Sequence, residues 1–79
     1  MLIKPKIDYS AFLRAIRLCK GEVTFQTDDG DLLNLKSMLS EYIFVTITAD
    51  PDFIRNGRLI CKNNSDYETL EEYLIPEAD

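Results

Sequence analysis

The sequence contains no histidine and no tryptophan, and it has only three glycines and two cysteines. The lack of histidine excludes an imidazole base or nucleophile, and with it a serine–histidine–aspartate triad. The glycines are too scattered to form a loop that cradles a phosphate. We therefore expect a protein that is not an enzyme and that holds no cofactor.

The two cysteines, Cys19 and Cys61, lack the Cys-x-x-Cys spacing of metal and redox sites. Two such cysteines without any histidine predict no metal site. We expect both to be buried thiols in a cytoplasmic protein, because thiols stay reduced in that compartment. A disulfide between them is the weaker alternative.

Long apolar runs are also missing. The longest, residues 42–45, is far shorter than the roughly 20 residues of a membrane-spanning helix. The N-terminus lacks the apolar core of a signal peptide. We expect no membrane association and a single domain, residues 1–79, in which roughly 60% of the extended-chain surface becomes buried.

The net charge of −5 is unevenly distributed. Residues 1–20 carry five bases and one acid, whereas residues 63–79 carry six acids and no base. An acidic chain is a poor nucleic-acid binder, so we expect no such partner. Arg14 and Arg17 share one exposed helical face, which favours either a solvated surface or contact with an anion or an acidic partner.

Hydrophobic periodicity and capping signals predict seven elements. They are a strand at 2–7, a helix at 9–20 capped by Asp8 and ended by Gly21, a hairpin of strands 22–27 and 31–35, a short helix at 37–43 capped by Ser37, a strand at 58–62, and a helix at 66–74 begun by a capping box at Ser65.

The segment between the short helix and the last strand is harder to interpret. Residues 43–48, IFVTIT, are the most strand-prone run of the chain, so we expect an extended segment there, with a regular strand as the main alternative. We expect a loop at residues 49–52, because the residue before Pro51 disfavours helical geometry. Residues 53–55 could pair with the strand at 58–62 as a small hairpin. Residues 77–79 should form a loose tail.

Amphipathic helices need an apolar sheet face to cover. The predicted fold is therefore α+β, a two-layer open-faced sandwich of order β-α-β-β-α-β-α, with a mostly antiparallel sheet under helices on one face. The first and last helices should lie side by side, where their opposite charges screen each other.

The segment Leu33–Met38, LNLKSM, resembles the V-N-L-K-S-I/M segment of HPr, the histidine-containing phosphocarrier of the sugar phosphotransferase system. The predicted element order is also that of the HPr family. Two features depart from the family pattern. The G-x-H-A-R-P segment with its phosphoacceptor histidine is missing, and the connection before the last strand is a few residues longer.

The resemblance implies a regulatory, bacterial, HPr-like module that binds a protein partner. It places Ser37 where the family carries a regulatory phosphorylation site, and Met38, Leu39 and Tyr42 where it presents an apolar docking patch. The plainer interpretations are an ordinary N-cap for Ser37 and partial core packing for the other three. The alternative functions are a kinase substrate phosphorylated on Ser37, or a structural domain that self-associates by pairing strands at 43–48. We expect the chain to be a monomer or a weak homodimer.

Overall fold

The structure is a computed structural model that describes residues 1–76. Its elements follow in chain order. They are β1 (Leu2–Ile3), α1 (Tyr9–Arg17), β2 (Val23–Gln26), β3 (Leu32–Asn34), α2 (Met38–Ile47), α3 (Pro51–Asn56), β4 (Arg58–Cys61), α4 (Asp66–Thr69), the 3₁₀ helix η1 (Glu71–Tyr73) and β5 (Leu74–Ile75).

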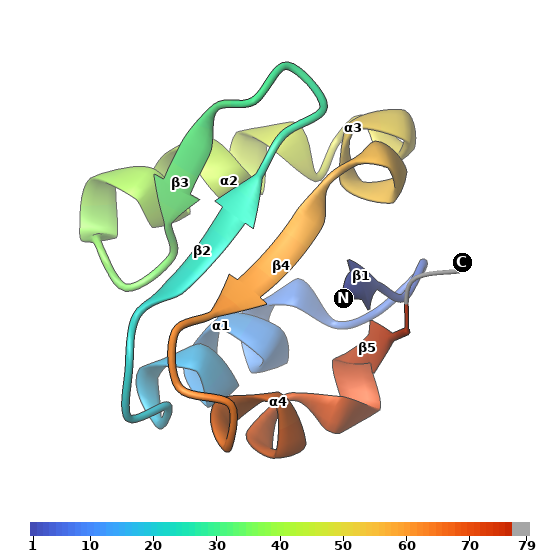
Figure 1. The fold of residues 1–79 in the computed structure, drawn as a ribbon. Helices are drawn as coiled ribbons and strands as arrows, with labels where there is room; N and C mark the ends of the chain where they lie inside the picture. The colour runs from blue at the N-terminus through green and yellow to red at the C-terminus, as the bar shows by residue number, and fades with distance from the viewer. Residues whose placement is uncertain (77–79) are drawn as a thin grey trace.

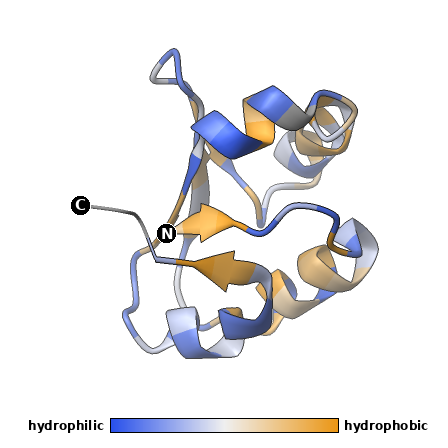
Figure 2. Ribbon diagram, turned by 90° about the vertical axis from the view of Figure 1, so that its right-hand side faces the viewer, coloured by the Kyte–Doolittle hydropathy of each residue, from blue (hydrophilic) through white to orange (hydrophobic). Residues whose placement is uncertain are grey.

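The predicted α+β class is confirmed, with two small antiparallel sheets. The larger sheet has the order β3-β2-β4, and the smaller one pairs β1 with β5. The backbone of Met1 donates to and accepts from that of Leu59, at 3.3 and 2.8 Å, and so links the two sheets. Helices α1 and α2 lie behind the larger sheet (Figure 1), and β1 and β5 form an apolar antiparallel pair beside them (Figure 2).

Strand β2 is the centre of the larger sheet, and its side chains alternate as predicted. Val23 and Phe25 are fully buried, whereas Thr24 and Gln26 lie on the opposite, more exposed face. The Phe25 ring meets Phe44 of α2 edge to face, with ring centroids 5.3 Å apart. The hydrophobic core therefore lies between the sheet and the helices.

Helix α2 corrects the expectation for residues 43–48. These residues form neither an extended segment nor a strand, because α2 continues to Ile47. Phe44 is fully buried against Phe12 and Phe25, and Ile47 packs at the edge of the same core. Their three-residue spacing suits a helix, and this packing outweighs the strand preference of β-branched residues.

Helix α3 occupies the segment that was expected to be a loop and a small hairpin. The Asp50 carboxylate accepts a hydrogen bond of 3.0 Å from the backbone of Asp52 and so caps the helix. Pro51 stands at the first helical position, where its missing N–H costs nothing. Ile54 is buried on the inner side. The predictions for residues 49–52 and 53–55 were wrong, because Asp50 and Pro51 start a helix where a loop and a strand were expected.

The first helix begins as predicted but ends early. The Asp8 carboxylate accepts from the backbone of Ser10 and Ala11, at 3.0 and 3.2 Å. The helix ends at Arg17, before the expected stop at Gly21, because a tighter turn closes it with a bond from Leu18 to Ala15.

Both ends of the described chain also differ from expectation. The strand expected at 2–7 covers only residues 2–3, because a turn follows in which Lys6 adopts a φ of 60°. The helix expected at 66–74 is divided between α4 and η1, and its last residue begins β5. Ser65 makes no capping bond, so the predicted capping box was wrong. The predicted tail, residues 77–79, lies outside the described residues.

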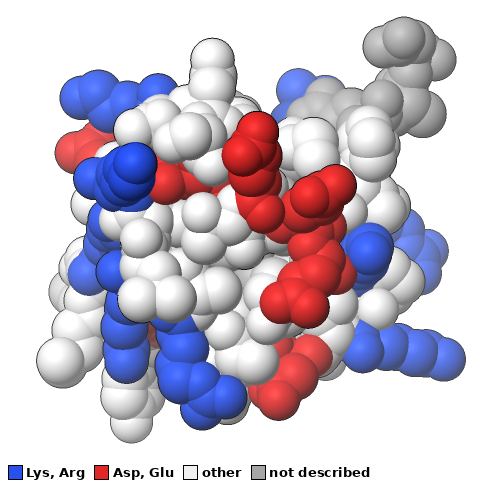
Figure 3. All heavy atoms as spheres, turned by 90° about the horizontal axis from the view of Figure 1, so that it is seen from below, with Lys and Arg blue, Asp and Glu red and all other residues white. Residues whose placement is uncertain are grey.

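The basic first helix and the acidic C-terminal segment are neighbours, as predicted. The rings of Phe12 and Tyr73 lie 5.5 Å apart, and the Asp66 carboxylate accepts from the backbone of Lys20 and Gly21, at 2.9 and 2.8 Å. Seen from below, acidic side chains form a band, and basic side chains lie on both sides of it (Figure 3).

Candidate docking surface on helices α1 and α2

The outer face of α2 is apolar and exposed. Met38, Leu39 and Tyr42, the predicted docking residues, have exposed fractions of 81%, 74% and 78%. The interpretation of these residues as partial core is therefore wrong. Ile43 and Val45 extend the apolar face, with exposed fractions of 43% and 52%. We call these five residues the α2 patch.

Glu41 is the only charged residue among the ten of α2, and it does not face solvent. It is 8% exposed, and its carboxylate accepts a 3.1 Å hydrogen bond from the Arg17 guanidinium of α1. The water-facing side of the helix therefore carries no charge at all. Its exposed residues are apolar apart from Thr46, and apolar residues on the outer face of a helix are normally covered by a partner.

Helices α1 and α2 run in opposite directions. Arg17 at the end of α1 meets Glu41 near the start of α2, whereas Tyr9 at the start of α1 packs against Phe44 further along α2. Between them lies a groove of about 260 Å³. Its lining residues are Leu13, Arg17, Met38, Glu41, Tyr42 and Val45. The groove joins the α2 patch to the basic face of α1.

The two predicted arginines, Arg14 and Arg17, have different surroundings. Arg17 forms an ion pair with Glu41, although 63% of its side chain remains exposed. Arg14 is exposed and acts electrostatically on Tyr73 of η1, where burial and the neighbouring Glu72 raise the pKa of the tyrosine. Arg17 therefore lines the groove, whereas Arg14 is not among its lining residues.

Ser37 stands at the N-cap position of α2, but its side chain makes no capping hydrogen bond. The turn before the helix is closed by Asn34 instead. The Asn34 side chain accepts from the backbone of Lys36, and its backbone carbonyl accepts from the backbone of Ser37, both at 3.0 Å. The expected cap is therefore absent, and the Ser37 hydroxyl remains half-buried at the start of the helix.

Sequence reasoning missed the roles of Glu41 and Asp66. Both are buried acids whose partners lie on other elements. The sequence signal for Glu41 was a lone acid in an otherwise apolar helix, whereas Asp66 stands among polar residues and carried no such signal. The backbone bonds from Gly21 and Lys20 hold the pKa of Asp66 below its ordinary value.

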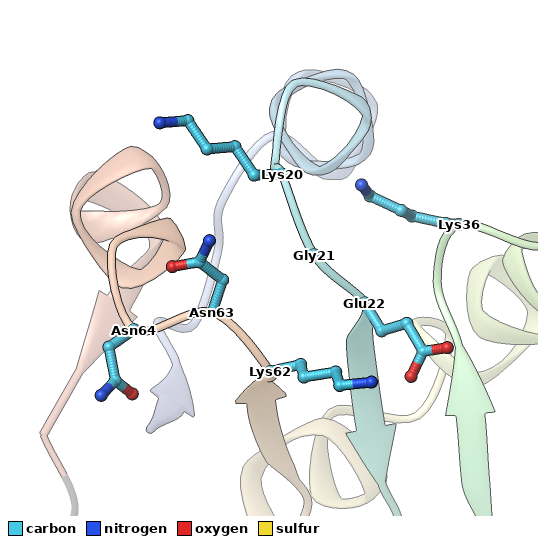
Figure 4. Close-up of a pocket in the computed structure, with 7 residues that line it drawn as sticks. All are labelled: Lys20, Gly21, Glu22, Lys36, Lys62, Asn63 and Asn64. Carbon is cyan, nitrogen blue, oxygen red and sulfur yellow. The ribbon is translucent and has the colours of Figure 1, made fainter.

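A second, basic hollow lies where α1, β2 and β4 meet (Figure 4). Its lining residues are Lys20, Gly21, Glu22, Lys36, Lys62, Asn63 and Asn64. The three ammonium groups do not converge. Lys20 points toward α4, Lys36 binds the carbonyl of Cys19, and Lys62 points toward Glu22 (Figure 4). This hollow is therefore a poor anion site.

The chemistry of the remaining groups is limited. Cys19 and Cys61 are free, buried thiols, as predicted. Burial is the main cause that raises the pKa of Cys61 to about 11, so it is protonated at neutral pH. Within residues 1–76, no three His, Cys, Asp or Glu side chains gather as a metal site would require, and no helix has the length and apolar character of a membrane span.

No protein-family model, curated protein or solved structure matches this chain.

Proposed function

We propose that this chain is a non-catalytic module that docks a protein partner on the α2 patch and the adjoining groove. The observation that carries the proposal is the distribution of charge on α2. Its single charged side chain is turned inward to Arg17, while five apolar side chains face water. Exposed apolar patches on small soluble proteins commonly mark interaction sites.

The surroundings of the patch indicate the chemistry of the partner. Arg17 lines the groove with more than half of its side chain exposed. Among the described residues that line the groove, Glu41 is the one acid, and it is already paired with Arg17. The partner should therefore present an apolar segment flanked by acidic residues, because charge complementarity guides encounter and orientation.

The resemblance to HPr supports the same surface. In that family, the segment corresponding to LNLKSM leads into a helix used for docking, and here Leu33–Met38 leads from β3 into α2. Without a histidine, phosphoryl transfer by imidazole is impossible. On this proposal the chain is an HPr-like regulatory protein that has kept a docking surface and lost the carrier chemistry.

Phosphorylation of Ser37 is the second candidate. It is favoured by a hydroxyl that caps no backbone group and stands at the start of a ten-residue helix, where the helix dipole favours a phosphate. Incubation with the kinase that phosphorylates the HPr serine, followed by intact-mass measurement, tests it. The expected result is one added phosphate, lost in Ser37→Ala. An unchanged mass rejects this candidate.

Self-association by pairing strands at 43–48 does not fit this fold, because residues 43–47 are helical. A homodimer that buries the α2 patch is a different arrangement. Light scattering over a dilution series distinguishes this homodimer from docking to another protein. A dimer that forms with rising concentration and is lost in Leu39→Asp would mean that the partner on the α2 patch is a second copy of this chain.

A capture experiment with matched variants tests the proposal. Leu39→Asp places a charge within the patch, whereas Ile60→Asp places one on the opposite, open face of the sheet. Both positions are exposed, so both variants should fold, which circular dichroism checks. We expect the specific partner to be lost with Leu39→Asp and kept with Ile60→Asp. Equal capture by both variants and the wild type would reject the α2 patch as the docking site.

A further inference from the structure

A separate apolar cavity lies at the other end of the α1–α2 pair. It is bounded by the β1–β5 pair, the start of α1, the end of α2 and the inner side of α3. Its volume of about 360 Å³ falls within the range of roughly 300–1,000 Å³ that is usual for small-molecule sites. The docking surface does not use this cavity.

The walls of the cavity are mainly aliphatic, and the charged groups that line it among residues 1–76 are all of one sign. Leu2, Ile3, Ile54 and Ile75 supply apolar surface from three separate segments of the chain. The charged lining residues are Lys6 and Arg55, and no carboxylate of the described residues lines the cavity. Tyr9 adds a phenol, whose pKa is raised by burial, so it remains protonated and able to donate.

Lys6 stands in a backbone conformation that is unusual for its residue type. Its φ of 60° belongs to the left-handed region, which costs residues other than glycine, asparagine and aspartate roughly 1–2 kcal/mol. Within residues 1–76 it is the only non-glycine residue with a positive φ. Strained residues of this kind cluster at binding and functional sites. Here the strained residue is Lys6, a cation that lines the cavity.

Arg55 is only weakly engaged by the protein. Its guanidinium lies 3.9 Å from the Asp52 carboxylate, and both side chains are about three-quarters exposed. Exposed pairs of this kind contribute little. The guanidinium is therefore available to a ligand that brings its own negative charge.

We propose that this cavity binds an aliphatic carboxylate, with the hydrocarbon chain against the apolar walls and the carboxylate near Lys6, Arg55 and Tyr9. The two cations favour an anionic head group over a neutral or cationic one. The aliphatic walls favour a hydrocarbon tail over a compact polar metabolite.

A titration with three ligands of equal tail length tests the proposal. Octanoate, octanol and octyltrimethylammonium are added to the ¹⁵N-labelled full chain, and backbone shifts are followed by nuclear magnetic resonance. We expect octanoate to shift the amides of β1, Lys6, Ile54 and Ile75, and to bind about tenfold more tightly than octanol. No saturable shift with octanoate, or equal affinity for all three ligands, would overturn the proposal.

Two charge-removing variants locate the site. Lys6→Asn keeps a residue that tolerates a positive φ, so the fold is retained while the cation is lost. We expect it to weaken octanoate binding about tenfold, whereas Lys62→Asn, in the basic hollow of Figure 4, leaves affinity unchanged. Equal loss in the two variants, or octanoate-induced shifts confined to α2, would contradict the assignment.

Discussion

The Arg17 guanidinium donates a 3.1 Å hydrogen bond to the Glu41 carboxylate and joins the last turn of α1 to the first turn of α2. The pair is asymmetric, because the arginine side chain is 63% exposed and the glutamate side chain only 11%. It therefore accommodates the only charge of α2 at the inner edge of that helix and leaves the outer face apolar.

Removing one partner of this pair should cost more than removing both. We expect Arg17→Met to lower the free energy of unfolding by about 1–3 kcal/mol, because it leaves a nearly buried carboxylate without its donor. The double variant with Glu41→Gln should regain part of that loss, and the coupling energy should be about 0.5–1 kcal/mol. Urea denaturation of the four proteins measures it, and a coupling of zero would show that the ion pair contributes nothing.

Two of the three predicted N-caps, Asp8 and Ser37, should respond differently to alanine. Asp8 accepts two backbone hydrogen bonds, so Asp8→Ala should lower the free energy of unfolding by about 1 kcal/mol. Ser37 caps nothing, so Ser37→Ala should change it by less than about 0.5 kcal/mol. Urea denaturation compares the two variants. Equal losses would mean that the serine hydroxyl does cap α2.

Gly57 is required because its backbone touches an aromatic ring. A Cβ built on it would lie 2.1 Å from Cζ of Phe25, which cannot be accommodated without movement. We expect Gly57→Ala to lower the free energy of unfolding by about 1–3 kcal/mol. Phe25→Leu should cost less in the Gly57→Ala background than in the wild type, since the smaller side chain leaves room. Strictly additive losses would contradict the contact.

The Asp66 carboxylate should make stability depend on pH in the acid range. Backbone hydrogen bonds from Gly21 and Lys20 hold its folded-state pKa below the ordinary value, so the charged form is the stabilising one. Its contribution is present above the ordinary carboxyl pKa of about 4 and is lost as the pH falls through the lower folded-state pKa. Asp66→Asn should flatten this acid limb in thermal denaturation, whereas Asp29→Asn in the exposed turn should not. Parallel curves for wild type and Asp66→Asn would disprove this role.

The local features of the fold were predictable from sequence, and the features that depend on distant contacts were not. The alternation of β2, the Asp8 cap and the hairpin at residues 28–30 are read from neighbouring residues, and the structure has them. The helical state of residues 43–47 depends on Phe44 reaching Phe12 and Phe25, which strand propensity does not register. Strand β5 exists because Leu74 and Ile75 meet β1, at the other end of the chain.

The candidate surface was predictable only in part. The spacing of Met38, Leu39 and Tyr42 placed them on one helical face, but the exposure of that face depends on which side of α2 meets the sheet. The roles of Glu41 and Asp66, and the cavity beside Lys6, arise from segments that are far apart in sequence.

Photo-crosslinking from the α2 patch tests the central claim most directly. A photoreactive phenylalanine analogue replaces Tyr42 in one protein and Ile60, on the open face of the sheet, in another, and both are irradiated in cells of the source organism. If a partner docks on the α2 patch, a discrete adduct with a second protein forms from position 42 and none from position 60. Adducts from position 60 alone, or the same adducts from both positions, would contradict that claim.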